Sequence, residues 1–164
     1  MHKSGLFITL AIASAFGGSV LAQTSSAQDM AAQSAYSDIE RTLGTIPGFF
    51  KLFPDVGIAG AWSEFKMVQL NPKTKLDGKT KELLGLAVAS QIPCAYCIYF
   101  HTAAAKANGA SEDEIRETVA MAAIVRHWST VLNGMQVDLA DFKRDTDTVL
   151  RLAAEKAKTA PKSQ

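Results

Sequence analysis

The stretch that decides the fold runs from Glu82 to His101 and reads ELLGLAVASQIPCAYCIYFH. Its first part is mostly apolar without strand-like alternation, which predicts a helix packed against other parts of the protein. The segment 91–93 should end that helix, because proline disfavours helical backbone in the residue before it. Pro93 suits the first turn of a second helix, which we expect over residues 93–107, with Asn108-Gly109 as its stop.

Outward from this stretch, apolar residues keep helical spacing in both directions and alternating strand patterns are absent. Asp77 and Ser111 are suitable N-cap residues, and Glu114 completes a capping box with Ser111. Alanine-rich faces predict helices that approach one another closely. The fold class is therefore predicted to be all-α, with about six or seven helices in a domain over residues 36–158. Helices are expected over residues 37–44, 55–70, 77–90, 93–107, 115–125 and 126–142, with a last one ending near Lys158.

The N-terminus has the pattern of a secretory signal peptide over residues 1–22. Lys3 supplies a positive start, an apolar stretch follows, and Val20-Leu21-Ala22 offers small residues at a cleavage site. An uncleaved membrane anchor is the alternative, although the apolar run is shorter than the roughly 20 residues that span a bilayer. We expect a periplasmic or secreted protein in which the small, polar residues 23–35 form a flexible lead-in.

Composition excludes several classes of protein. The chain has 164 residues, 48% of them hydrophobic, which is enough for one domain with its own core. Seventeen basic and 16 acidic residues give a net charge of +1, so no basic excess points to nucleic acid. Two cysteines are too few for a scaffold built on disulfides, but in an oxidising compartment a nearby pair can persist as a disulfide.

The side chains best suited to catalysis are those of Glu82, Cys94, Cys97 and His101. Cysteines three apart on a helix share a face, so the two sulfurs can form a disulfide or pass electrons. In the first turn of a helix, backbone N–H groups and the helix dipole favour the thiolate of Cys94. His101 lies one turn after Cys97 and can take its proton, and Glu82 from the preceding helix can orient that imidazole. These four residues are the candidate catalytic set, and their thiol chemistry requires neither a metal nor a flavin.

Two other functions are consistent with the same residues. One is a Cys₂His₂ zinc site, and the other is a helical oligomer in which the cysteines form only a static disulfide. The tyrosines at 96 and 99 are expected to be packing aromatics, and His127 is expected to be a hydrogen-bonded interior residue. The candidate zinc ligands are Cys94, Cys97, His101 and His127.

The spacing Glu82-x11-Cys94-x2-Cys97-x3-His101 resembles the AhpD-like branch of the carboxymuconolactone decarboxylase family. The resemblance covers about residues 37–140 and includes the helix start at 111–115. It implies an all-α fold, usually trimeric or hexameric, and alkylhydroperoxide reductase or thiol-disulfide chemistry. Family decarboxylases typically lack the cysteine pair, so decarboxylation is not expected.

The resemblance also implies a role for each site residue. Cys97 matches the cysteine that attacks peroxide, Cys94 matches the one that resolves it as a disulfide, and Glu82 and His101 match the proton relay. Tyr96 stands where peroxidase members often carry a further histidine. The implied partners are a hydroperoxide or disulfide substrate, a protein or small-molecule thiol reductant, and further copies of the chain in a homo-oligomer.

Overall fold

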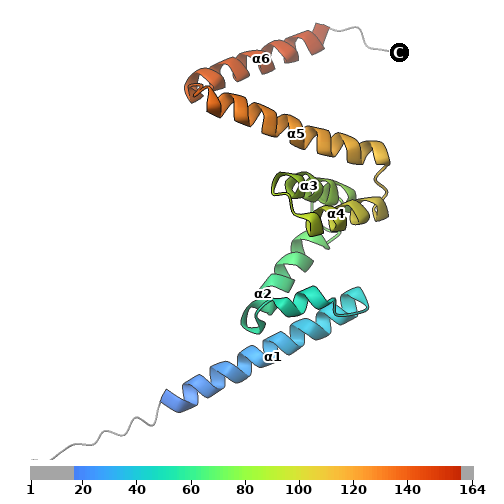
Figure 1. Ribbon diagram of the computed structural model, residues 1–164, viewed down its shortest axis with the longest axis vertical. Helices are drawn as coiled ribbons and strands as arrows, with labels where there is room; N and C mark the ends of the chain where they lie inside the picture. The colour runs from blue at the N-terminus through green and yellow to red at the C-terminus, as the bar shows by residue number, and fades with distance from the viewer. Residues whose placement is uncertain (1–16, 160–164) are drawn as a thin grey trace, which may run out of the picture. The chain divides into compact units, whose positions relative to one another are not determined.

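The structure, a computed structural model, describes residues 17–159. Within them the chain forms six α-helices and no strand, which confirms the predicted all-α class. The chain divides into two compact units, Met1–Thr74 and Lys75–Gln164 (Figure 1). No helix in the described range is long and apolar enough to span a membrane. The expected domain bounds 36–158 stay a prediction.

The first unit is built from two α-helices. α1 spans Gly17–Leu43 and α2 spans Asp55–Glu64; a 3₁₀ turn at Gly48–Leu52 precedes α2 and a π-helical turn at Phe65–Gln69 continues it. α2 packs against the second half of α1 through Ile58 and Trp62. α1 ends as expected, with Gly44 in the left-handed conformation at φ 78°.

The expectation of a flexible lead-in over residues 23–35 was wrong about its local structure, because these residues lie inside α1. Ala32, Ala35 and Ile39 share one face of the helix and are buried against Ile58 and Trp62 of α2. Packing of this face stabilises the helix in spite of the polar residues between. Residues 1–16 of the expected signal peptide lie outside the described residues.

The second unit contains the four other α-helices and carries the candidate site. α3 and α4 lie side by side, and α5 packs on α3 (Figure 1). The predicted caps are present, since Asp77 accepts a hydrogen bond from the Thr80 N–H and Ser111 forms the capping box with Glu114. The helices are α3 Gly78–Gln91, α4 Ala95–Ala107, α5 Glu112–Gly134 and α6 Leu139–Thr159.

Three boundaries differ from the expectation. The break predicted near residue 126 is absent, because α5 is continuous to Gly134 and the turn follows it. The α-helix expected over residues 55–70 ends at Glu64, and a π-helical turn at Phe65–Gln69 takes the place of its last part. Pro93 precedes α4, and Cys94 is the N-cap of that helix.

Candidate functional site

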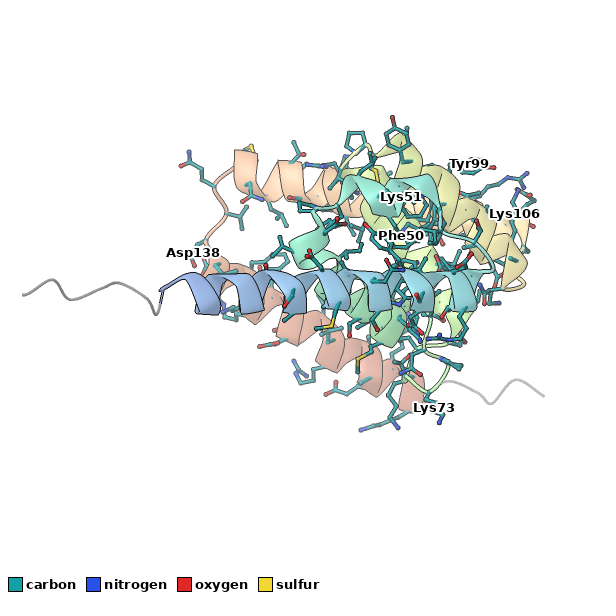
Figure 2. The ribbon with its side chains drawn as sticks, turned by 90° about the horizontal axis from the view of Figure 1, so that it is seen from below. Phe50, Lys51, Lys73, Tyr99, Lys106 and Asp138 are labelled. Atoms are coloured by element: carbon teal, nitrogen blue, oxygen red, sulfur yellow. A yellow bond between two sulfur atoms is a disulfide. The ribbon has the colours of Figure 1, made fainter. Side chains whose placement is uncertain are left out.

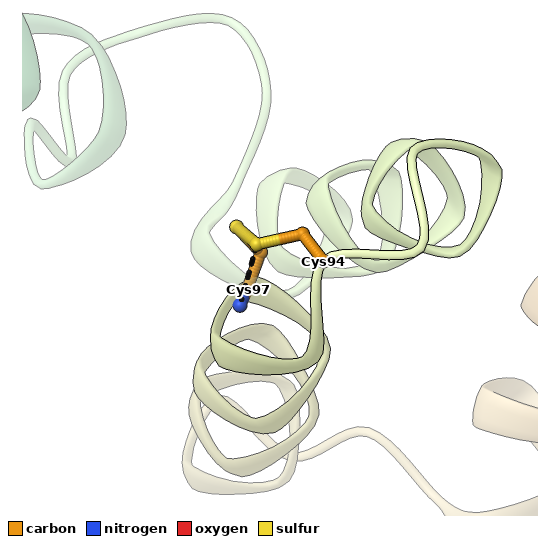
Figure 3. Close-up of a disulfide and its surroundings, with 2 residues drawn as sticks. All are labelled: Cys94 and Cys97. Atoms are coloured by element: carbon orange, nitrogen blue, oxygen red, sulfur yellow. Dashed lines mark hydrogen bonds between the residues drawn. A yellow bond between two sulfur atoms is a disulfide. The ribbon is translucent and has the colours of Figure 1, made fainter.

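Cys94 and Cys97 open α4 as a disulfide, shown in Figure 3. Their Cα atoms are 5.3 Å apart, a spacing typical of disulfides. Cys94 is the N-cap, and its Sγ accepts a hydrogen bond from the Cys97 backbone N–H at 3.2 Å. The first N–H groups of a helix lack partners within the helix, so this position favours a sulfur that carries negative charge.

Glu82 and His101 meet across the contact between α3 and α4. His101 Nδ1 lies 2.7 Å from Glu82 Oε2. Glu82 is only 5% exposed, and the side chain of His101 is 19% exposed. An ionised carboxylate can only accept hydrogen bonds, so with Glu82 charged the Nδ1–H of His101 donates, leaving Nε2 for a second proton partner.

The four predicted site residues thus form two pairs, the Cys94–Cys97 disulfide and the Glu82–His101 contact. Both pairs lie on the neighbouring helices α3 and α4. His101 follows Cys97 by one helical turn, so the two side chains lie on the same side of α4. Glu82 comes from α3 and contacts the imidazole directly. The arrangement contains a disulfide, a base and a buried acid, which are the groups needed to move protons during thiol chemistry.

A hydrogen-bonded link from α5 to the turn before Cys94 was missed by the sequence analysis. Arg126 donates through Nε to Gln91 Oε1 at 2.7 Å and through Nη2 to the Gln91 carbonyl at 2.9 Å. Gln91 Nε2 donates to the carbonyl of Ala122. No local pattern predicts this link, because the residues are more than thirty positions apart.

Three residues differ in placement from the expectation. Tyr96 is 89% exposed and Tyr99 is 79% exposed, so neither packs inside the chain. His127 is also exposed, on a face of α5 that the chain leaves uncovered, so the expectation of an interior histidine was wrong. Within residues 17–159 no group of three or more His, Cys, Asp or Glu side chains is arranged to hold a metal ion.

A shallow, open pocket follows one face of α4 beside the disulfide. Tyr99 and Lys106 lie on this helix in Figure 2 and both line the pocket. The lining residues recur every three or four positions, so they form one stripe of the helix. They are Ala95, Ile98, Tyr99, Thr102, Ala103 and Lys106.

Ion pairing also fixes α3 to α5. Lys79 Nζ lies 2.7 Å from Glu114 Oε1. The hydrogen bond from Lys79 lowers the pKa of the Glu114 carboxyl, and the same contact raises the pKa of Lys79. Both side chains are more than a third exposed, so the pair orients the two helices without a large effect on stability.

Comparisons with known proteins agree on the fold. The structure is similar to the crystal structure of the alkylhydroperoxidase AhpD core from Rhodospirillum rubrum, with a TM-score of 0.59 and 21% identity, over 79% of this chain and 93% of that one. A relative in Paracoccus denitrificans, described as uncharacterized protein 4 in the cox locus, is 39% identical over 51 residues. That match covers 31% of this chain and 46% of the relative, so the chain spans about half of its length. The model of the carboxymuconolactone decarboxylase family matches residues 57–138, and the chain belongs to that family.

Proposed function

We propose that this protein is an exported thiol-disulfide oxidoreductase with alkylhydroperoxidase-like chemistry, in which Cys97 and Cys94 form the redox pair. The observation that carries the proposal is the 2.7 Å contact between Glu82 and His101, one helical turn from a disulfide at the start of α4. A static crosslink needs no buried acid and base beside it. Family membership supports the same class of chemistry.

In the reduced protein, His101 holds the proton of Cys97 and leaves a thiolate. That thiolate attacks the terminal oxygen of a hydroperoxide, the O–O bond breaks, and Cys97 becomes a sulfenic acid while an alcohol leaves with the relayed proton. The sulfur of Cys94 then attacks Cys97, the S–S bond forms, and water leaves. A dithiol reductant exchanges with the disulfide and returns both thiols.

Glu82 stabilises the positive charge that forms during the cycle, and the start of α4 stabilises the negative charge. The Glu82 carboxylate stabilises the imidazolium that forms when His101 takes a proton, because opposite charges in a buried site attract strongly. The Cys97 N–H stabilises negative charge on Cys94 as it attacks. With a disulfide as substrate, the Cys97 thiolate attacks one of its sulfurs, the S–S bond of the substrate breaks, and one thiol leaves with the relayed proton. Cys94 then attacks Cys97 in the mixed disulfide, and the second substrate thiol leaves as the Cys94–Cys97 bond forms.

Export and oligomerisation complete the proposal. The sequence of residues 1–22 supports export, and an oxidising compartment requires a reductant that operates outside the cytoplasm. Large apolar side chains exposed on α5 and α6 support a homo-oligomer, a trimer or hexamer, because single chains rarely leave such faces in water. They include Trp128 at 55%, Leu139 at 63% and Val149 at 64% exposure.

The experiment is turnover of an organic hydroperoxide or of a dithiol/disulfide couple by the wild-type protein and by Cys97→Ser. We expect the variant to lose the activity, and equal rates would contradict the proposal. A brief peroxide pulse with a sulfenic-acid trap, followed by mass spectrometry, identifies the sulfur that reacts. Modification of Cys97 supports the assigned roles, and modification of Cys94 reverses them.

A further inference from the structure

Gly85 lies on α3 three residues after Glu82, so the two residues share a face of the helix. The imidazole of His101 rests against this face. A Cβ atom built on Gly85 would lie 2.8 Å from His101 Cγ and closer still to Nδ1 and Cε1. No real Cβ is tolerated that close to a ring, so the ring can occupy this position only because residue 85 has no side chain.

Helix propensity argues against glycine at this position. Gly85 lies in the middle of α3, where glycine is less favourable than alanine by roughly 0.5–1 kcal/mol. Its backbone does not have a positive φ, so the conformation gives no reason for glycine either. The close approach of His101 is the reason that the structure offers.

We propose that Gly85 is a positioning residue for the site: it leaves the space in which His101 turns Nδ1 toward Glu82. The inference rests on the proposed function for its consequence, since a displaced imidazole would no longer be oriented as the base for Cys97. It concerns an interaction within α3 and α4, so it can be tested by a spectroscopic measurement as well as by activity.

The variant is Gly85→Ala, and the matched control is Gly60→Ala, because Gly60 lies inside α2 with open space where its Cβ would be. The first measurement is NMR of the ring nitrogens and the hydrogen-bonded Nδ1–H of His101. We expect the Nδ1–H resonance in the wild type and in Gly60→Ala, and its loss in Gly85→Ala. Retention of the resonance in Gly85→Ala would overturn the inference.

Activity is the second measurement. Displacement of a catalytic group by about 1 Å lowers rates by about 10²-fold, so Gly85→Ala should lose about that much in kcat, with KM little changed. Gly60→Ala should keep the wild-type rate. Failure of the proposed function is distinguishable, since a wild type with no turnover would overturn that function while the NMR comparison still decides the role of Gly85.

A thermal unfolding cycle keeps the inference testable if Gly85→Ala folds poorly. The ring atoms that meet the new Cβ are absent in His101→Ala. We therefore expect Gly85→Ala to lower the melting temperature of the wild type but not that of His101→Ala, where the alanine gains helix propensity without a clash. An equal loss in both backgrounds would overturn the inference.

Discussion

The two units of the molecule each place a carboxylate beside an aromatic nitrogen, and the two arrangements differ in what they can do. In the first unit, Asp38 accepts hydrogen bonds from Trp62 Nε1 at 2.7 Å, from Lys66 at 2.8 Å and from Arg41 at 2.6 Å. In the second, Glu82 pairs with Nδ1 of His101 at 2.7 Å. The distances are alike, but the partners are not.

The partners of Asp38 do not give up protons near neutral pH. Lys66, first, and then Trp62 and Arg41 hold the pKa of Asp38 well below its usual range, so this carboxylate stays charged and fixed. Imidazole, in contrast, gains and loses a proton near neutral pH. The comparison indicates that a carboxylate bound by permanent donors is structural, whereas one bound to histidine next to a disulfide can serve proton transfer.

The largest expected effect is that of Glu82→Gln. The substitution keeps the shape of the side chain but removes the charge that orients and stabilises the His101 imidazolium. General acid–base catalysis contributes about 10²–10⁴-fold, and we expect the rate of peroxide or disulfide turnover to fall by about that range. Steady-state kinetics measures it.

The control for this variant is Glu117→Gln, because Glu117 is exposed on α5. It should retain the wild-type rate. An unchanged rate in Glu82→Gln, with its fold verified by circular dichroism, would show that the two carboxylates are both structural and that the comparison between the units fails.

The second-largest expected effect is that of Trp62→Ala on the stability of the first unit. Trp62 is 3% exposed, it packs in the core with Ile39 and Ile58, and its ring lies 5.6 Å from that of Phe50. Replacing a buried tryptophan by alanine costs about 3–5 kcal/mol, so Trp62→Ala should lower the free energy of unfolding by that amount in denaturant titrations. Trp62→Phe keeps most of the packing and should lose less. An equal loss in both would mean that the indole N–H, and not the ring, dominates.

The sequence predicted well those features that depend only on residues close together in the chain. Asp77 and Ser111 cap their helices, and Gly44 and Gly109 have the positive φ values, 78° and 83°, that favour glycine after a helix. The spacing from Cys97 to His101 also needs only the geometry of one helix. The contact with Glu82 depended on the two helices packing together, and the structure has that contact.

Other features depended on neighbours that spacing does not reveal. The helical state of residues 23–35 follows from burial of Ala32 and Ala35 against α2. The importance of Gly85 follows from the approach of a ring on another helix. His127 was expected inside from its residue type, but it lies on an uncovered face. In each case tertiary contacts decide, and one sequence does not specify them.

A third prediction tests, through the effect of acid pH, whether the charge of Asp38 stabilises the first unit. Its folded pKa is lowered, so its contribution to stability is present above the unfolded value of about 3.9 and is lost as the pH falls through the lower folded pKa. In a Trp128→Phe background, Trp62 is the only tryptophan and its fluorescence reports on this cluster. We expect Asp38→Asn to be less stable than its parent near neutral pH, and this difference to shrink in strong acid. A constant difference would mean that the charge of Asp38 contributes nothing.

The smallest expected effect is that of Lys79→Met, which removes the ion pair with Glu114. Two effects oppose each other here. The pair holds α3 to α5, but Lys79 also places a positive charge in the first turn of α3, where the helix dipole disfavours it. Exposed ion pairs contribute little to stability, and salt screens them. We therefore expect Lys79→Met to change the melting temperature only slightly, and by even less at high salt. A large loss in melting temperature would show that this exposed pair of a carboxylate with a permanent donor stabilises the second unit more than exposed ion pairs usually do.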